Sequence, residues 1–137
     1  MVDDVILGKA EIIERCLRRI ADVYADDPRH LREDMLRQDS IFLNLERACQ
    51  ASIDLALRVV KLRQLGVPRD SRDSFALLEK AGLLPAELSQ ALQRMVGFRN
   101  IAIHDYRKVN LDIVESLLRE EPARLRQFVK LCVQLAD

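Results

Sequence analysis

The sequence contains few residues of the kinds that interrupt helices. Among its 137 residues are only 4 Gly and 4 Pro, aromatic residues make up 4%, and Trp is absent. Leu, Ala, Arg and Glu, which favour helices, are abundant. We therefore expect an all-α fold in which short turns join the helices. The length suffices for one hydrophobic core and is too small for two ordinary domains, so residues 1–137 are predicted to form a single domain.

An excess of charge of one sign is also missing. The chain has 22 Lys and Arg residues against 22 Asp and Glu residues, so its formal net charge at pH 7 is +0. This balance excludes the basic surface over the whole molecule that is typical of non-specific nucleic-acid binders. Any contact with nucleic acid must therefore depend on a local group of basic residues.

Long uncharged apolar runs are missing too, and Asp3 and Asp4 lie where a signal peptide would carry positive charge. We therefore expect a soluble, cytoplasmic protein that makes no contact with a membrane. The three cysteines, Cys16, Cys49 and Cys132, are odd in number, far apart and without CxxC spacing. This pattern favours reduced, buried thiols over disulfides or zinc ligands.

Apolar residues recur at helical spacing along most of the chain. The expected elements are a helix over 3–25, a short helical turn at 29–37, a long central helix over 41–65, a short helix over 74–82, a helix over 85–108, a helix over 111–120 and a last helix over 123–136. Such elements make a bundle of five or six helices.

Residues that start or stop helices set these boundaries. The expected N-caps are Asp39 or Ser40, Ser71 or Asp70, and Asn110. Pro85 and Pro122 suit the first turn of a helix, whereas Gly66 and Gly82 suit the residue after a helix end.

Asp54 lies on an apolar, Ala-rich section of the central helix, where an unpaired carboxylate is costly. One interpretation makes it an exposed residue at the margin of the apolar stripe. The other makes it the partner of an Arg on a neighbouring helix. The sequence favours neither.

Side chains suited to chemistry gather near the C-terminal end of the segment 85–108. That end reads Arg99-Asn100-Ile101-Ala102-Ile103-His104-Asp105-Tyr106. Residues four apart on a helix lie on one face, so the amide of Asn100 is placed to hold the imidazole of His104. A general acid or base needs such a fixed tautomer and orientation.

Arg99 and Tyr106 are seven apart and share a different face of the same helix. That face is apolar and also carries Leu88, Leu92, Met95 and Ala102. A guanidinium in an apolar stripe is costly unless it meets an anion, a buried carboxylate or a wet cleft. Its position therefore indicates one of these three surroundings.

Arg99 and His104 are about 140 degrees apart on an ideal helix, so one helix does not aim both at one small target. Either the Arg side chain reaches round, or the helix loosens near His104, or two copies of the helix face each other. We favour the last arrangement, in which a homodimer forms a symmetric cleft with an Arg and a His from each subunit.

Basic residues outnumber acidic ones around this segment, because Arg94, Arg99, Arg107 and Lys108 stand against Asp105. RNA phosphate is attracted to such a group. Cleavage of an RNA phosphodiester needs a base for the 2′-hydroxyl, an acid for the leaving oxygen and a cation for the developing charge. His and Arg supply these functions without a metal or another cofactor. Against this, a lone His on a polar helix face is more often a solvated residue.

The octapeptide that begins at Arg99 resembles the RxxxxHxY signature of HEPN-domain proteins, and the Asn after the Arg is typical of their HepT branch. The segments SIFLNLERACQASIDLALRVV and SFALLEKAGLLPAELSQALQRMVGFRNIAIHDY are similar to that branch as well. The resemblance implies an all-helical domain that dimerises around the motif helix. It also implies a metal-independent RNA endonuclease, the toxin of a toxin–antitoxin pair whose antitoxin is an MNT-type nucleotidyltransferase.

The resemblance further implies roles for the motif residues. Arg99 would neutralise the scissile phosphate, His104 would act as acid or base, and Asn100 would orient the site. Tyr106 would shape the cleft and accept an AMP group from the antitoxin, which silences the toxin. Arg94, Arg107 and Lys108 remain candidates for binding RNA phosphates.

Two other functions stay open. The chain resembles partners of nucleotidyltransferases but has no Gly-Ser plus Asp-x-Asp motif of its own, so it is alternatively a non-enzymatic subunit that presents a substrate or nucleotide to such an enzyme. In the plainest alternative it is a helical dimerisation module in which Arg99 pairs with Asp54 or another carboxylate.

Overall fold

The computed structural model is all-helical over the residues that it describes, which are 3–104 and 109–135 without the side chains of Ile103 and His104. Its elements are α1 (Asp4–Tyr24), α2 (Pro28–Arg32), α3 (Met35–Leu62), α4 (Ser71–Lys80), α5 (Ala86–His104) and α6 (Leu111–Leu135). The predicted fold class, a bundle of five or six helices, is confirmed for these residues.

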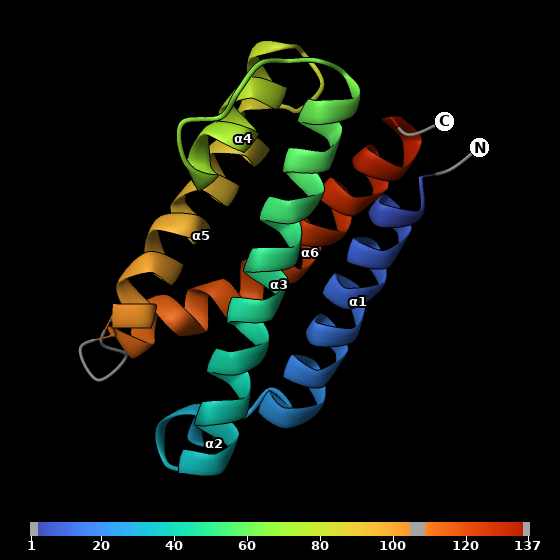
Figure 1. Ribbon diagram of the computed structural model, residues 1–137. Helices are drawn as coiled ribbons and strands as arrows, with labels where there is room; N and C mark the ends of the chain where they lie inside the picture. Colours follow the sequence, from blue (N-terminus) through green and yellow to red (C-terminus); the bar gives the residue numbers. More distant parts are fainter. Residues whose placement is uncertain (1–2, 105–108, 136–137) are drawn as a thin grey trace.

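The long helix α3 is the centre of the bundle. It packs along α1 and also contacts α4, α5 and α6, and the C-terminal half of α6 runs back toward α1 (Figure 1). The apolar face of α1 is buried as its periodicity predicts, with Ile6, Ile13 and Leu17 at most 2% exposed. Phe75 of α4 meets Phe128 of α6 edge to face, with ring centroids 5.5 Å apart. The helices thus share one main core around α3.

The three cysteines are free and buried, as predicted. Cys49 lies on α3 and Cys132 on α6, and each is 1% exposed. Burial raises the pKa of both thiols to about 12. At neutral pH they are therefore protonated, small apolar groups of the core.

The start of α3 differs from the prediction. The helix begins at Met35 and is capped by Asp34, whose carboxylate accepts a hydrogen bond from the backbone N–H of Arg37 across 3.1 Å. The expected N-caps Asp39 and Ser40 lie inside the helix. The buried apolar stripe does not mark the first turn of this helix, because Met35 and Leu36 in that turn are 68% and 83% exposed. The prediction from the stripe therefore started the helix too late.

The structure also joins two expected helices into one. The helix α6 runs from Leu111 to Leu135 with Pro122 inside it, so the prediction that Pro122 starts a separate helix is wrong. Proline lacks the N–H that would bond the carbonyl four residues earlier, and its ring crowds that carbonyl. Figure 1 shows α6 changing direction between its orange first half and its red second half. Buried residues on both sides of the bend, Val114 and Leu125 among them, hold the two halves to the bundle.

Other boundaries agree with the prediction within a few residues. Asp70 caps α4, where its Oδ1 accepts a hydrogen bond from the N–H of Asp73 across 2.8 Å. Gly82 follows α4 with a φ of 77°, a left-handed conformation that favours glycine. Pro85 immediately precedes α5, and its carbonyl accepts from the N–H of Ser89. Within the described residues, we find no helix with both the length and the apolar character needed to cross a membrane.

Candidate functional site

The apolar face of α5 leads to Arg99, as the sequence predicts. Leu88, Leu92 and Met95 on this face are buried, and Arg99 follows one turn after Met95 with its side chain half-buried. The helix stays regular as far as His104. These three residues belong to the main core, and the turn that follows them places the guanidinium beside Gln50 of the central helix.

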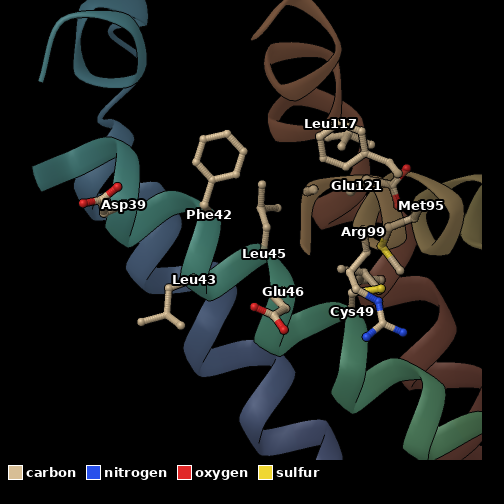
Figure 2. Close-up of a pocket in the computed structure, with 13 residues that line it drawn as sticks. Asp39, Phe42, Leu43, Leu45, Glu46, Cys49, Met95, Arg99, Leu117 and Glu121 are labelled. Carbon is tan, nitrogen blue, oxygen red and sulfur yellow. The ribbon is translucent and has the colours of Figure 1, made fainter. Parts of the chain in front are cut away.

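Arg99 lies at a pocket of about 450 Å³ between α3, α5 and α6. The lining is mostly apolar, and Phe42 and Leu45 from α3 stand across the opening from Leu117 of α6 in Figure 2. Its polar members besides Arg99 are three carboxylates and a thiol: Asp39, Glu46, Glu121 and Cys49. The sequence indicated an anion, a buried carboxylate or a wet cleft next to Arg99, and in the structure Arg99 lies at a cleft.

Among the described residues, the guanidinium of Arg99 contacts the side chains of Gln50 and Cys49 on α3. Its Nη1 donates to Oε1 of Gln50 on α3 across 3.1 Å, and its Nε is buried without a partner. In Figure 2 the group reaches toward α3 beside Cys49. In the described part of the chain, no carboxylate forms an ion pair with Arg99.

Asp54 is not the direct partner of Arg99. Its Oδ2 lies 3.1 Å from Nζ of Lys9 on α1, and its Oδ1 accepts a hydrogen bond from Nε2 of Gln50 across 2.9 Å. Among the described residues the cationic partner of Asp54 is therefore a Lys on a neighbouring helix and not the predicted Arg, Arg99 included, and Asp54 is half-buried and not exposed. The two residues are connected instead through the amide of Gln50.

Sequence reasoning missed Gln50. The available signal was its spacing from Asp54, because Gln and Asp four apart on a helix commonly hydrogen-bond to each other. That signal reveals the pair on α3 but not its contact with α5, which depends on how the two helices pack.

The other predicted site residues are placed only in part. Asn100 is exposed on α5, on the turn before His104, which is the last residue of that helix. Arg94 is exposed and lines a separate hollow of about 400 Å³ with Arg124 of α6. The predicted contact between Asn100 and His104 involves a side chain outside the described residues. Three more predicted residues lie outside them entirely: Tyr106, Arg107 and Lys108.

Comparison with known proteins assigns this arrangement a family. A family model described as ribonuclease HepT-like matches residues 13–132. The mRNA nuclease HepT of Shewanella oneidensis is 44% identical over 128 residues, which are 93% of this chain and 96% of that protein. The range 13–132 that the family model matches contains positions 50, 54 and 99 and reaches at least part of each of the six described helices.

Solved structures are similar over nearly the whole chain. The tri-AMPylated Shewanella oneidensis HEPN toxin in complex with MNT antitoxin is 43% identical, with a TM-score of 0.89 over 94% of this chain and 96% of that one. A toxin–antitoxin crystal structure with AMP-PNP is 42% identical, with a TM-score of 0.89 over 95% and 98% of the two chains.

Proposed function

This chain belongs to the ribonuclease HepT-like family, and on that premise we propose that it is the RNA-cleaving toxin of a toxin–antitoxin pair, active as a homodimer and without a metal. The observation that carries the proposal is the half-buried guanidinium of Arg99. It faces a pocket, forms no ion pair with any described carboxylate, and lies five positions before His104 on α5. We further propose that residues 1–137 form one domain that acts in the cytoplasm.

In this mechanism the 2′-oxygen of RNA attacks the neighbouring phosphorus and the bond to the 5′-oxygen breaks. A base takes the proton of the 2′-hydroxyl, and an acid gives a proton to the leaving 5′-oxygen. His104 serves in one of these roles, with its ring oriented by Asn100. Arg99 binds the scissile phosphate and stabilises its developing charge. Arg94, Arg107 and Lys108 bind flanking phosphates.

The position of these residues on one helix supports the proposed homodimer. Positions 99 and 104 are about 140 degrees apart around its axis. Arg99 faces the pocket beside α3, whereas Asn100 is exposed and Ile101 is 63% exposed. We propose that a second copy covers Ile101 on this exposed side, so that the motif helices of the two subunits lie next to each other and their Arg99 and His104 residues share one cleft.

The relatives support a proposal of regulation by a partner. The similar HEPN toxin is tri-AMPylated and in complex with an MNT antitoxin. We propose that an MNT-type nucleotidyltransferase adds AMP to Tyr106 of this chain. The phosphate of this AMP would place negative charge near Arg99 and compete with RNA for the cation.

The test is RNA cleavage by the purified full chain in the presence of a chelator. Cleavage by the wild type, together with its loss in folded Arg99→Ala and His104→Ala, is the expected result. Wild-type activity in either variant contradicts the assigned roles, and inactivity until a metal is added contradicts metal independence. Harmless expression of the wild type without its partner would instead support a non-enzymatic subunit that presents a substrate or nucleotide to the nucleotidyltransferase.

Mixing the two inactive variants tests the homodimer. If each site takes Arg from one subunit and His from the other, a heterodimer of Arg99→Ala and His104→Ala keeps one complete site and cleaves RNA. If both residues of a site come from one subunit, every site in the mixture carries a substitution. A mixture that stays inactive after subunit exchange therefore contradicts the shared cleft.

A further inference from the structure

Three helices are joined by polar contacts that end at Arg99. Lys9 of α1 forms an ion pair with Asp54 of α3, Asp54 accepts a hydrogen bond from Gln50 one turn earlier, and Gln50 accepts one from Arg99 of α5. Lys9 and Asp54 are each 32% exposed, so their contact is partly shielded from water. The guanidinium is thus tied through α3 to α1, the helix that packs most extensively on α3.

The two ends of the Gln50 amide have different partners, and this fixes its orientation. The NH₂ group of a glutamine only donates hydrogen bonds, and its carbonyl oxygen only accepts them. Asp54 is an acceptor, so it holds the NH₂ group at 2.9 Å and leaves the carbonyl oxygen facing Arg99. The opposite orientation would set donor against donor at Arg99 and acceptor against acceptor at Asp54.

The neutral charge of Gln50 matters for a cation that must bind phosphate. An amide oxygen holds the guanidinium in place without cancelling its charge, whereas a carboxylate at the same distance would form an ion pair and compete with the phosphate. The negative charge of Asp54 is separated from Arg99 by the side chain of Gln50 and is balanced by Lys9.

We propose that Gln50, oriented by Asp54, is a positioning residue that holds Arg99 for the scissile phosphate while leaving its charge unpaired. This inference deepens the proposed function and rests on it. It assigns no contact between Gln50 and RNA. Gln50 acts only through the direction and the availability of the guanidinium.

Two substitutions separate these effects. Gln50→Met has similar length but no hydrogen-bonding group, so Arg99 keeps its charge and loses its orientation. We expect kcat to fall about tenfold, the scale of a lost hydrogen bond to a charged group, with the salt dependence of RNA binding unchanged. Gln50→Glu keeps an acceptor but pairs the charge, so we expect KM to rise about tenfold.

The salt dependence of RNA binding is the readout that a purely structural role would not change. Each phosphate contact with single-stranded RNA contributes a slope of roughly −0.7 to a plot of log affinity against log salt concentration. Gln50→Glu should therefore lose roughly 0.7 of the slope of the wild type. The matched control is Gln134→Glu, which adds the same carboxylate at an exposed position of α6 and should behave as the wild type.

The experiment uses the full chain, with thermal melts to show that each variant is folded. Wild-type kcat in Gln50→Met, or a wild-type salt slope in Gln50→Glu, overturns the proposal. If Gln50→Met does not fold, Asp54→Ala replaces it, since that variant frees the amide to turn and should also lower kcat. Absence of cleavage by the wild type instead overturns the proposed function. Cleavage that depends on Arg99 but not on Gln50 overturns only this inference.

Discussion

Nη1 of Arg124 donates a hydrogen bond across 3.0 Å to Oε1 of Glu121, three residues earlier on α6. Glu121 is 2% exposed, and its Oε2 is buried without a hydrogen-bond partner among the described residues. Burial therefore raises the pKa of the Glu121 carboxyl above its usual value of 4.5, although Arg124 opposes the change. The folded protein thus binds a proton on this carboxyl more tightly than the unfolded chain does.

The variant Glu121→Gln should therefore change how stability depends on pH. The wild type loses stability as pH rises from about 4.5 through the raised pKa, because the folded state must give up a proton that it binds more tightly than the unfolded state does. The amide of the variant would bind no proton, so the variant should melt higher than the wild type near about pH 8, and this advantage should vanish below about pH 4. Thermal melts across this range measure the difference. A constant difference at every pH would refute the explanation.

The cap of α3 makes a second prediction about stability. Asp34→Ala removes the acceptor of the N–H of Arg37 and should lower the free energy of unfolding by about 1 kcal/mol. Asp39→Ala is the matched control, because Asp39 is exposed inside the helix and should change stability by less than about 0.5 kcal/mol. Urea unfolding compares the two. A larger loss of unfolding free energy in Asp39→Ala than in Asp34→Ala would support Asp39 as the cap, as predicted from the sequence.

Arg99→Lys tests whether the shape of the guanidinium matters as well as its charge. Lysine keeps the positive charge but lacks the planar fork of donors that binds phosphate through two hydrogen bonds. We expect RNA cleavage to fall about 10²-fold, as for loss of a donor to a developing charge. Initial rates in chelator measure the effect, with the melting temperature as a control for folding. Equal rates for lysine and arginine would show that a point charge suffices.

Tyr106→Phe tests the proposed site of AMP addition. The variant keeps the aromatic ring but lacks the hydroxyl that would receive AMP, so it should retain part of its nuclease activity and resist silencing by the nucleotidyltransferase partner. Incubation with the partner and ATP, followed by mass spectrometry and an RNA cleavage assay, measures both effects. AMP on the phenylalanine variant would show that another residue is the target.

Local interactions explain which features the sequence could predict. Helical periodicity and capping depend on residues within one or two turns, so the all-α fold, the buried face of α1 and the cap at Asp70 were predictable. The apolar line on α5 likewise indicated that Arg99 meets an anion, a buried carboxylate or a wet cleft, and the pocket between α3, α5 and α6 is visible only in the structure. The start of α3 was predicted too late because exposed residues extend the helix back to its cap at Asp34. The break expected at Pro122 is absent because packing on both sides of the proline outweighs its local cost.

The surroundings of Arg99 depend on contacts between distant parts of the chain. Gln50 precedes it by 49 residues and reaches it only because α3 and α5 pack against each other. The sequence showed that the charge of Asp54 on an apolar helix is costly. It did not show that the partner is Lys9, because that contact depends on the packing of α1 on α3. The residue pattern along one helix sets which face a side chain occupies. The packing of several helices sets which polar group it meets there, because burial of the shared apolar core fixes the helices relative to one another.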